Sequence, residues 1–275
     1  MTTETGKEKV SAVERSVQQR SVSGDQLDDL FRRQFKVADP SVVCEFFEWM
    51  TTQRATAIFN LWLARLQNPK VRQIGTERDW KEVGRQLKPN ADPILILRAM
   101  GPVMVVYDVS DTEGLQLPKS DEVARISIDT NRVLKSIRQL AELGIETKTK
   151  FVGAATAVAD GQARRKEKLH YSIDASGSDA PRFLFDKITR GACSIFCGHQ
   201  GRFFKALDPW PDRVHVSPAV EKFETEAAAF LVLARAGIRA PDALHLAPMV
   251  ESCNMATVSI DAVVRAAGKV EQLWR

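Results

Sequence analysis

The alternation of apolar and polar residues predicts three helices in the first third of the chain. The first starts at residues 23–25, Ser-Gly-Asp, and carries apolar side chains at roughly helical spacing. Residues 39–40, Asp-Pro, end it and open the second helix, which is rich in aromatic residues. The third covers residues 57–66, and an Asn-Pro pair at 68–69 stops it.

The middle of the chain changes to short apolar, partly β-branched runs. Residues 93–97 and 102–107 are predicted strands, and Met-Gly between them indicates a tight hairpin. A short helix at 79–84 carries a Trp that we expect to anchor it to this sheet. After the sheet, residues 129–143 form an amphipathic helix ended by Gly, followed by a strand candidate at 145–151.

The last third is predicted to be mainly helical. A strand-like run at residues 169–173 precedes it, and a Ser-, Gly- and Asp-rich loop follows that run. The expected helices cover residues 182–196, 217–236, a short piece from Pro241, and 257–273. The fold class is therefore α+β, with a helical N-terminal part, a small and mainly antiparallel sheet, and a helical C-terminal half.

These patterns suggest a division into three parts. Residues 1–22 are polar with a weak pattern, and we expect a mobile tail. Residues 23–150 hold the first helices and the sheet, and residues 151–275 hold the predominantly helical remainder.

Composition is that of an ordinary globular protein. The chain has 275 residues, of which 44% are hydrophobic and 27% charged, with a net charge of +4. No apolar run has membrane-spanning length and the first residues lack the apolar centre of a secretory signal, so we expect a cytoplasmic protein without a membrane partner. Four scattered cysteines suggest reduced thiols, and the mildly basic charge permits nucleic-acid binding without showing it.

One segment carries a family resemblance. Residues 195–199, Ile-Phe-Cys-Gly-His, resemble the segment that directly follows His-Glu-x-x-His in ArdC-like and ImmA/IrrE-like zinc metallopeptidases of the anti-restriction type. Other blocks resemble the family in the same order: 59–63, 80–89, 92–97, 101–103, 107–114 and Glu-x-Glu-Ala at 224–227. The resemblance implies a zincin-like C-terminal half, single-stranded DNA binding in the N-terminal half, and a place in mobile-element, anti-restriction or repressor-control biology.

The zinc motif itself is degenerate. A zincin needs two His ligands one helical turn apart and a Glu as general base, but the matching positions are Arg190, Gly191 and Ser194. Arg190 is a permanent cation, Gly191 has no side chain, and a Ser hydroxyl is a poor zinc ligand. By the resemblance, Glu226 is the remaining candidate for the third ligand. We therefore expect a catalytically inactive protein without a cofactor.

An alternative is a zinc-dependent endopeptidase with an unorthodox ligand set. Cys193 and Cys197 are one turn apart on the predicted helix, and His199, His215 and Glu226 could complete a site. The competing interpretation is that Cys197 and His199 pack and cap the helix end, as they do in the family's segment after the ligands. Metal content separates the two.

Candidate nucleic-acid contacts come from basic residues. A cluster at Arg164, Arg165, Lys166 and Lys168 could bind phosphates, and in the N-terminal half other basic residues, among them Arg85 and Lys88, could form a groove. Trp49, Trp62 and Trp80 are possible stacking partners, but Trp49 and Trp62 sit at apolar helical positions, where a tryptophan more often belongs to the core, so the binding hypothesis rests on the resemblance and the charge. The hypothesis from the sequence is a protein that acts by binding, with single-stranded DNA or a regulatory or restriction-related protein as its partner.

Overall fold

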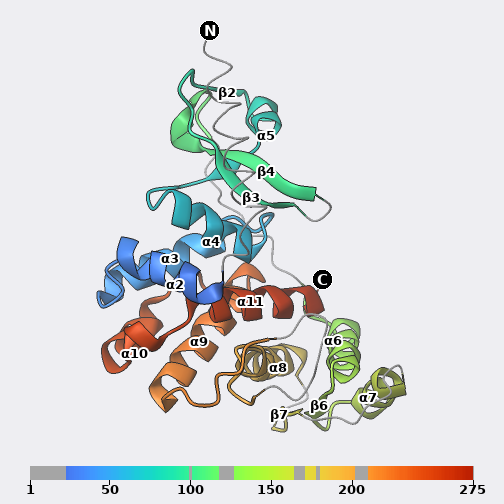
Figure 1. The fold of residues 1–275 in the computed structure, drawn as a ribbon. Coiled ribbons are helices and arrows are strands. Elements are labelled where there is room, and N and C mark those ends of the chain that lie inside the picture. Colours follow the sequence, from blue (N-terminus) through green and yellow to red (C-terminus); the bar gives the residue numbers. More distant parts are fainter. Residues whose placement is uncertain are drawn as a thin grey trace. The chain divides into compact units, whose positions relative to one another are not determined.

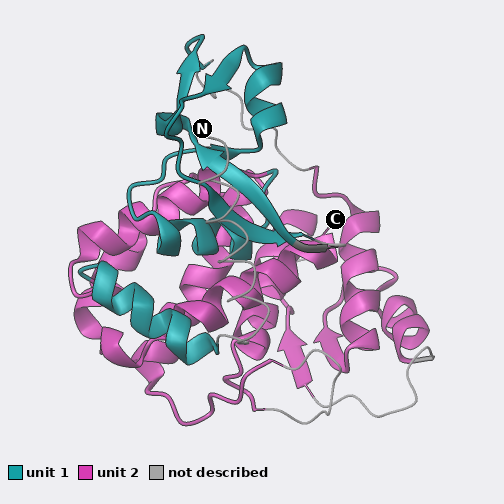
Figure 2. Cartoon of the chain, turned by 45° about the horizontal axis from the view of Figure 1, so that its top comes forward, with its two compact units in different colours: residues 1–36, 55–122 teal, residues 37–54, 123–275 magenta. Residues whose placement is uncertain are grey.

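The computed structural model describes residues 23–98, 101–117, 127–163, 171–177, 180–201 and 210–274 (Figure 1). The chain divides into two compact units (Figure 2). Unit 1 comprises residues 1–36 and 55–122, and unit 2 comprises residues 37–54 and 123–275. The expected tail at 1–22 and the basic cluster at 164–168 lie outside the described residues.

Among its described residues unit 1 contains three helices, and side-chain caps set the starts of two of them. The three are α2 (Gly24–Gln34), α4 (Ile58–Gln67) and α5 (Glu77–Glu82). Ser23 and Gln26 form a capping box at the start of α2, and Thr76 and Asp79 form another at the start of α5. The three helices occupy the ranges that the apolar pattern predicted, within a few residues.

Two small antiparallel sheets complete unit 1. The larger has the order β1 (Ile74–Gly75), β4 (Gly101–Asp108), β3 (Ile94–Arg98), and the smaller pairs β2 (Arg85–Leu87) with β5 (Thr112–Gly114). Trp80 of α5 is 2% exposed and its Nε1 donates to the carbonyl of Tyr107 at 3.2 Å. The predicted hairpin and its tryptophan anchor are therefore confirmed.

A buried carboxylate organises the loops at the end of β4. Asp108 accepts hydrogen bonds from the backbone N–H groups of Arg72 and Gln73 at 2.8 and 2.9 Å, and from Ser110. Burial acts to raise the pKa of Asp108, but these hydrogen bonds outweigh it and hold the pKa below its usual value. Asp108 also caps the short 3-10 turn η1 (Val109–Asp111).

Unit 2 is mainly helical and joins an early segment of the chain, residues 37–54, to residues 123–275. Its helices are α3 (Pro40–Thr52), α6 (Thr130–Glu142), α7 (Ala154–Ala163), α8 (Pro181–Phe196), α9 (Pro218–Arg235), α10 (Ala247–Ser252) and α11 (Ile260–Trp274). Two 3-10 turns, η2 (Leu244–Leu246) and η3 (Met255–Thr257), flank α10. Helices α8, α9 and α11 pack on one another, and α3 packs on α9 and α10 (Figure 1).

Strands β6 (Ile145–Lys148) and β7 (Tyr171–Asp174) of unit 2 pair in parallel. Helix α7 lies between them in sequence, and α6 and α8 pack against them. Their pairing places residue 145 beside residue 171, across the boundary at 150 that the sequence suggested. The structure divides the chain elsewhere, because α3 and β6 both belong to unit 2.

The architecture is α+β, as predicted, but the sheets are both antiparallel and parallel. Helix α7 was not predicted from the sequence. None of the helices within the described ranges is both long and apolar enough to cross a membrane.

Candidate functional site

Helix α8 carries residues 190–194, the segment that the resemblance matches to the zinc motif. Pro181 occupies its first turn, and apolar side chains along one face, among them Leu184, Ile188 and Ile195, are fully buried. After the helix, Gly198 has a φ of 91°, and a β-carbon there would lie 2.0 Å from the carbonyl oxygen of Pro211. Only glycine fits this turn, which directs the chain from α8 to His199.

Arg190, which the resemblance matches to the first zinc ligand, bonds to Glu226, which it matches to the third. Its Nη1 contacts Oε1 of Glu226 on α9, and its Nε donates to Asp186 Oδ2, one turn earlier on α8, at 3.0 Å. Burial acts to lower the pKa of Arg190, but the two carboxylates raise it above its ordinary value, so the side chain stays charged. A guanidinium thus neutralises Glu226, the carboxylate that the resemblance assigns to a metal.

Gly191, which the resemblance matches to the catalytic Glu, faces packed atoms. A β-carbon there would lie 2.6 Å from Cγ2 of Ile173 on β7, and Ile173 is only 3% exposed. Ser194 follows Arg190 by four residues, on the same face of α8. Position 191 therefore has no room for a longer side chain without movement of β7.

His245 of η2 lies near this ion pair. Its ring is 5.4 Å from that of Phe230, which follows Glu226 by one turn of α9. Burial lowers the pKa of His245, with Arg239 adding to the effect, while Glu226 and a backbone hydrogen bond with Asp242 act against it. The neutral His245 ring packs against the aromatic ring of Phe230.

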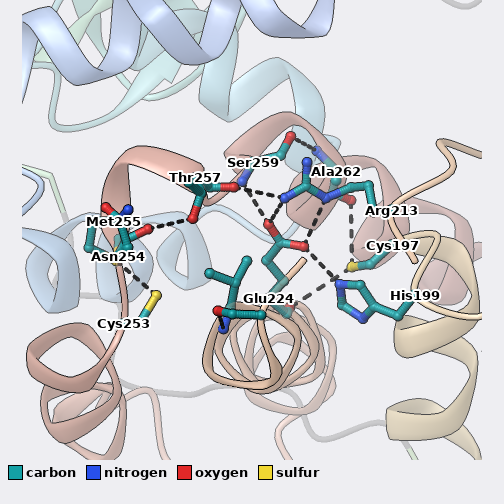
Figure 3. A network of polar contacts seen from close by, with 12 residues as sticks. Cys197, His199, Arg213, Glu224, Cys253, Asn254, Met255, Thr257, Ser259 and Ala262 are labelled. Carbon is teal, nitrogen blue, oxygen red and sulfur yellow. Dashed lines mark hydrogen bonds and ion pairs between the residues drawn. The ribbon is translucent and has the colours of Figure 1, made fainter. Parts of the chain in front are cut away.

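A second carboxylate of α9, Glu224, is the centre of a buried polar network (Figure 3). Its side chain has no exposed surface. Oε1 accepts from the backbone N–H of Ser259 at 2.7 Å and from Arg213 Nη2 at 2.5 Å. Oε2 accepts from Arg213 Nε at 3.1 Å and from His199 Nε2 at 2.8 Å. The bidentate arginine and two further donors satisfy this buried charge completely.

His199 links Glu224 to a hydroxyl. With Nε2 bonded to Glu224, its Nδ1 lies 3.2 Å from Oγ1 of Thr225, and a neutral ring with its proton on Nε2 satisfies both contacts. A Thr-His-Glu chain resembles the order of groups in a catalytic triad. The His199 side chain, however, has no exposed surface for a substrate to reach. These hydrogen bonds of His199 therefore connect the end of α8 to α9.

The alternative zinc ligands do not converge. Cys197 lies by the Glu224 network, with Sγ 4.0 Å from the Glu224 carbonyl oxygen, while Cys193 is fully buried. Burial raises the pKa of both thiols, which disfavours the thiolate that would bind zinc. Within the parts of the chain that the structure describes, no group of three His, Cys, Asp or Glu side chains is arranged to hold a metal ion. His199 is paired with Glu224 and Glu226 with Arg190.

A surface hollow of about 440 Å³ opens beside the Glu224 network. Its lining residues come from the segment before α9 and from around η3: Asp212, Arg213, His215, Val216, Ser217, Asn254 and Thr257. Arg213 reaches from this hollow to Glu224 and also donates to the carbonyl of Thr257 at 2.9 Å. His215, a member of the alternative zinc set, is thus exposed at the hollow.

The candidate nucleic-acid residues within the described ranges have structural partners. Arg85 bonds to Thr112 and to the carbonyl of Leu115 across the β2–β5 pair, and Lys88 Nζ donates to the Ser110 carbonyl at 2.7 Å. Trp62 and Trp80 are buried, and Trp49 is 9% exposed. The three tryptophans are core residues and do not present a face for base stacking. Arg164, Arg165, Lys166 and Lys168 lie outside the described residues.

Sequence reasoning missed Glu224, Arg213 and Asp186. Glu224 belongs to the Glu-x-Glu-Ala block, in which the resemblance indicates Glu226 as the metal ligand. A Glu two positions from another on one helix points to a different side, and the apolar neighbour Phe223 was a signal that position 224 could be buried. Nothing local marks Arg213 or Asp186.

Comparison of this chain with protein-family models, with characterised proteins and with solved structures gives no match. The family resemblance consequently rests on the quoted motifs and their order.

Proposed function

We propose that this chain acts by binding a macromolecular partner, on a metallopeptidase-like framework that has no zinc chemistry. The observation that supports this most strongly is the ion pair between Arg190 and Glu226. In the resembling family these two positions would hold zinc from opposite helices. Here a fixed positive charge takes the place of the metal and satisfies the carboxylate.

Packing around Gly191 supports the same proposal. A water-activating Glu at this position would need the space that Ile173 fills. The loss of the general base is therefore accompanied by closer packing of α8 on β7, so a single reverting mutation would not recover it. The ion pair of Arg190 with Glu226 occupies the position of the metal, and the packing of Gly191 on Ile173 fills the space of the general base.

Zinc analysis tests this proposal against the endopeptidase alternative. Protein incubated with zinc and desalted is expected to retain far less than one zinc per chain. Glu226→Gln should leave that value unchanged, as should Glu221→Gln, a matched change at an exposed Glu of the same helix. One zinc per chain, lost in Glu226→Gln and kept in Glu221→Gln, would establish the endopeptidase alternative.

For the partner, the buried tryptophans and the hydrogen-bonded Arg85 and Lys88 favour a protein over single-stranded DNA. The resemblance points to partners in restriction or repressor control. Titration of a labelled single-stranded oligonucleotide at several salt concentrations decides between the two classes, because a phosphate-tracking groove gives a log–log slope of about −0.7 per phosphate contacted. We expect no such slope.

The oligonucleotide titration has a matched control. If steep salt-dependent binding is found and is lost when Arg164, Arg165 and Lys166 are changed to Glu, single-stranded DNA is the partner and the protein branch fails. If binding is absent, a partner captured from source cells must bind again as a purified protein, in a defined ratio, for the protein branch to stand.

A further inference from the structure

The larger sheet of unit 1 has β3 at its edge. One side of β3 pairs with β4, with Ile94 opposite Val106 and Ile96 opposite Met104. The backbone groups of Leu95 and Leu97 point to the other side, where no further strand of the described residues pairs with the sheet. An edge of this kind is a template on which another strand can pair.

Two side-chain amides of α4 occupy this edge. Gln67 Oε1 accepts from the N–H of Leu95 at 2.9 Å, and its Nε2 donates to the carbonyl of the same residue at 2.7 Å. Asn60 makes the same pair of bonds with Leu97, at 3.0 and 2.9 Å. Each amide thus binds both backbone groups of one residue.

The arrangement imitates a neighbouring strand. A carboxamide carries one acceptor and a donor group on the same plane, as a peptide unit does. Asn60 and Gln67 are seven residues apart, close to two turns of α4, so both point toward β3. Leu95 and Leu97 are two residues apart and face the same way on the strand. Both amides therefore reach the free edge of β3 from one face of α4.

We propose that Asn60 and Gln67 guard the edge of β3 against strand pairing with a second copy of this chain. Residues 94–97 read Ile-Leu-Ile-Leu, a sequence with high strand propensity and no charge, and the Leu97 side chain is 46% exposed. Two identical copies of β3 can pair antiparallel about a two-fold axis, with Leu95 of one copy opposite Leu97 of the other. That register uses the backbone groups that the amides now hold.

The test compares association of the wild type with that of Asn60→Ala/Gln67→Ala. Light scattering after size-exclusion chromatography should show a mass for the double variant that rises with concentration above that of the wild type. Adding Leu97→Pro should restore the wild-type profile, because proline removes an N–H that the paired edge needs and is tolerated on edge strands. A folded double variant with the wild-type mass at every concentration, or association that Leu97→Pro leaves unchanged, would overturn the proposal.

Single variants keep the proposal testable if the double variant does not fold. Hydrogen exchange at individual amides should accelerate at Leu97 in Asn60→Ala and at Leu95 in Gln67→Ala, each without the other. Protection that stays at the wild-type level in both variants would show that the amides do not shield the edge, and the proposal would fail.

Discussion

A β-carbon added at Gly191 of α8 would lie 2.6 Å from Cγ2 of Ile173 on β7. Ile173 is buried and β-branched, so it has little freedom to move aside. Its contact with the helix backbone means that glycine at this position is required by packing. The close approach of α8 to β7 thus leaves no room at residue 191 for the Glu that the resemblance would place there.

Gly191→Ala should therefore destabilise the protein although alanine favours helices. Overpacking costs about 1–3 kcal/mol and helix propensity returns about 1 kcal/mol, so we expect a net loss of up to about 2 kcal/mol in the free energy of unfolding. Gly268→Ala in α11 is the matched control, because nothing lies within 4 Å of a β-carbon there. Urea unfolding that finds Gly191→Ala as stable as Gly268→Ala would refute the packing argument.

The double variant Arg190→His/Ser194→His should take up zinc. The two histidines would project from one face of α8, and Glu226, freed from Arg190, would supply a third ligand. We expect about one zinc per chain and a zinc-dependent rise in melting temperature. The triple variant that adds Gly191→Glu should be less stable than the double variant, since the Glu meets Ile173. A folded double variant without zinc would show that Glu226 does not reach the helix face.

Glu224→Gln should destabilise unit 2 strongly. The substitution removes the charge that Arg213 and His199 share and leaves one of their donors without a suitable acceptor. We expect a loss of about 3 kcal/mol, toward the lower end for a broken buried ion pair, because Arg213 is partly exposed. Glu221→Gln, on the exposed side of the same helix, should change the unfolding midpoint little. Equal midpoints for the two variants would contradict the assigned role of Glu224.

Asp108 should make unit 1 sensitive to acid. Its folded-state pKa lies below its unfolded value of about 3.9, so its contribution is present above that pH and is lost as the pH falls through and below it. Asp108→Asn should reduce stability at neutral pH by about 2 kcal/mol and weaken the acid dependence. Burial raises the pKa of Asp111, so its contribution to the free energy of unfolding increases as the pH falls, opposite to that of Asp108. Unfolding curves between pH 7 and pH 3 check this, and parallel pH profiles for wild type and variant would exclude the role of Asp108.

The helices that begin at an N-cap residue could be predicted from the sequence. Ser23, Asp39 and Asp129 each bond to a backbone N–H at the first turn of a helix, where the sequence placed its start. Helix α7 gave no such signal because its side chains are small and it contains Gly161. That glycine lets α7 approach α6 closely, since a β-carbon there would lie 2.3 Å from the Arg138 carbonyl oxygen.

The candidate site could be predicted only in part. That residues 190 and 194 are not histidines can be read from the sequence, because it depends only on residue types at one helical spacing. The pairing of Arg190 with Glu226 depends on how α8 and α9 pack, and these residues are 36 positions apart. The network around Glu224 was harder still to predict, since its partners come from three separate segments, at residues 199, 213 and 259. No local pattern carries that information.

Arg235 has a consequence for how the protein is made. From the end of α9 its guanidinium donates to the carbonyls of Met50, Gln53 and Arg54 at the end of α3, and to Glu271 in α11. Helix α3 is synthesised well before α9 and α11, the helices that carry Arg235 and Glu271. Unit 2 can therefore close only after α11 has been synthesised, and until then the apolar face of α3 lacks its native partners.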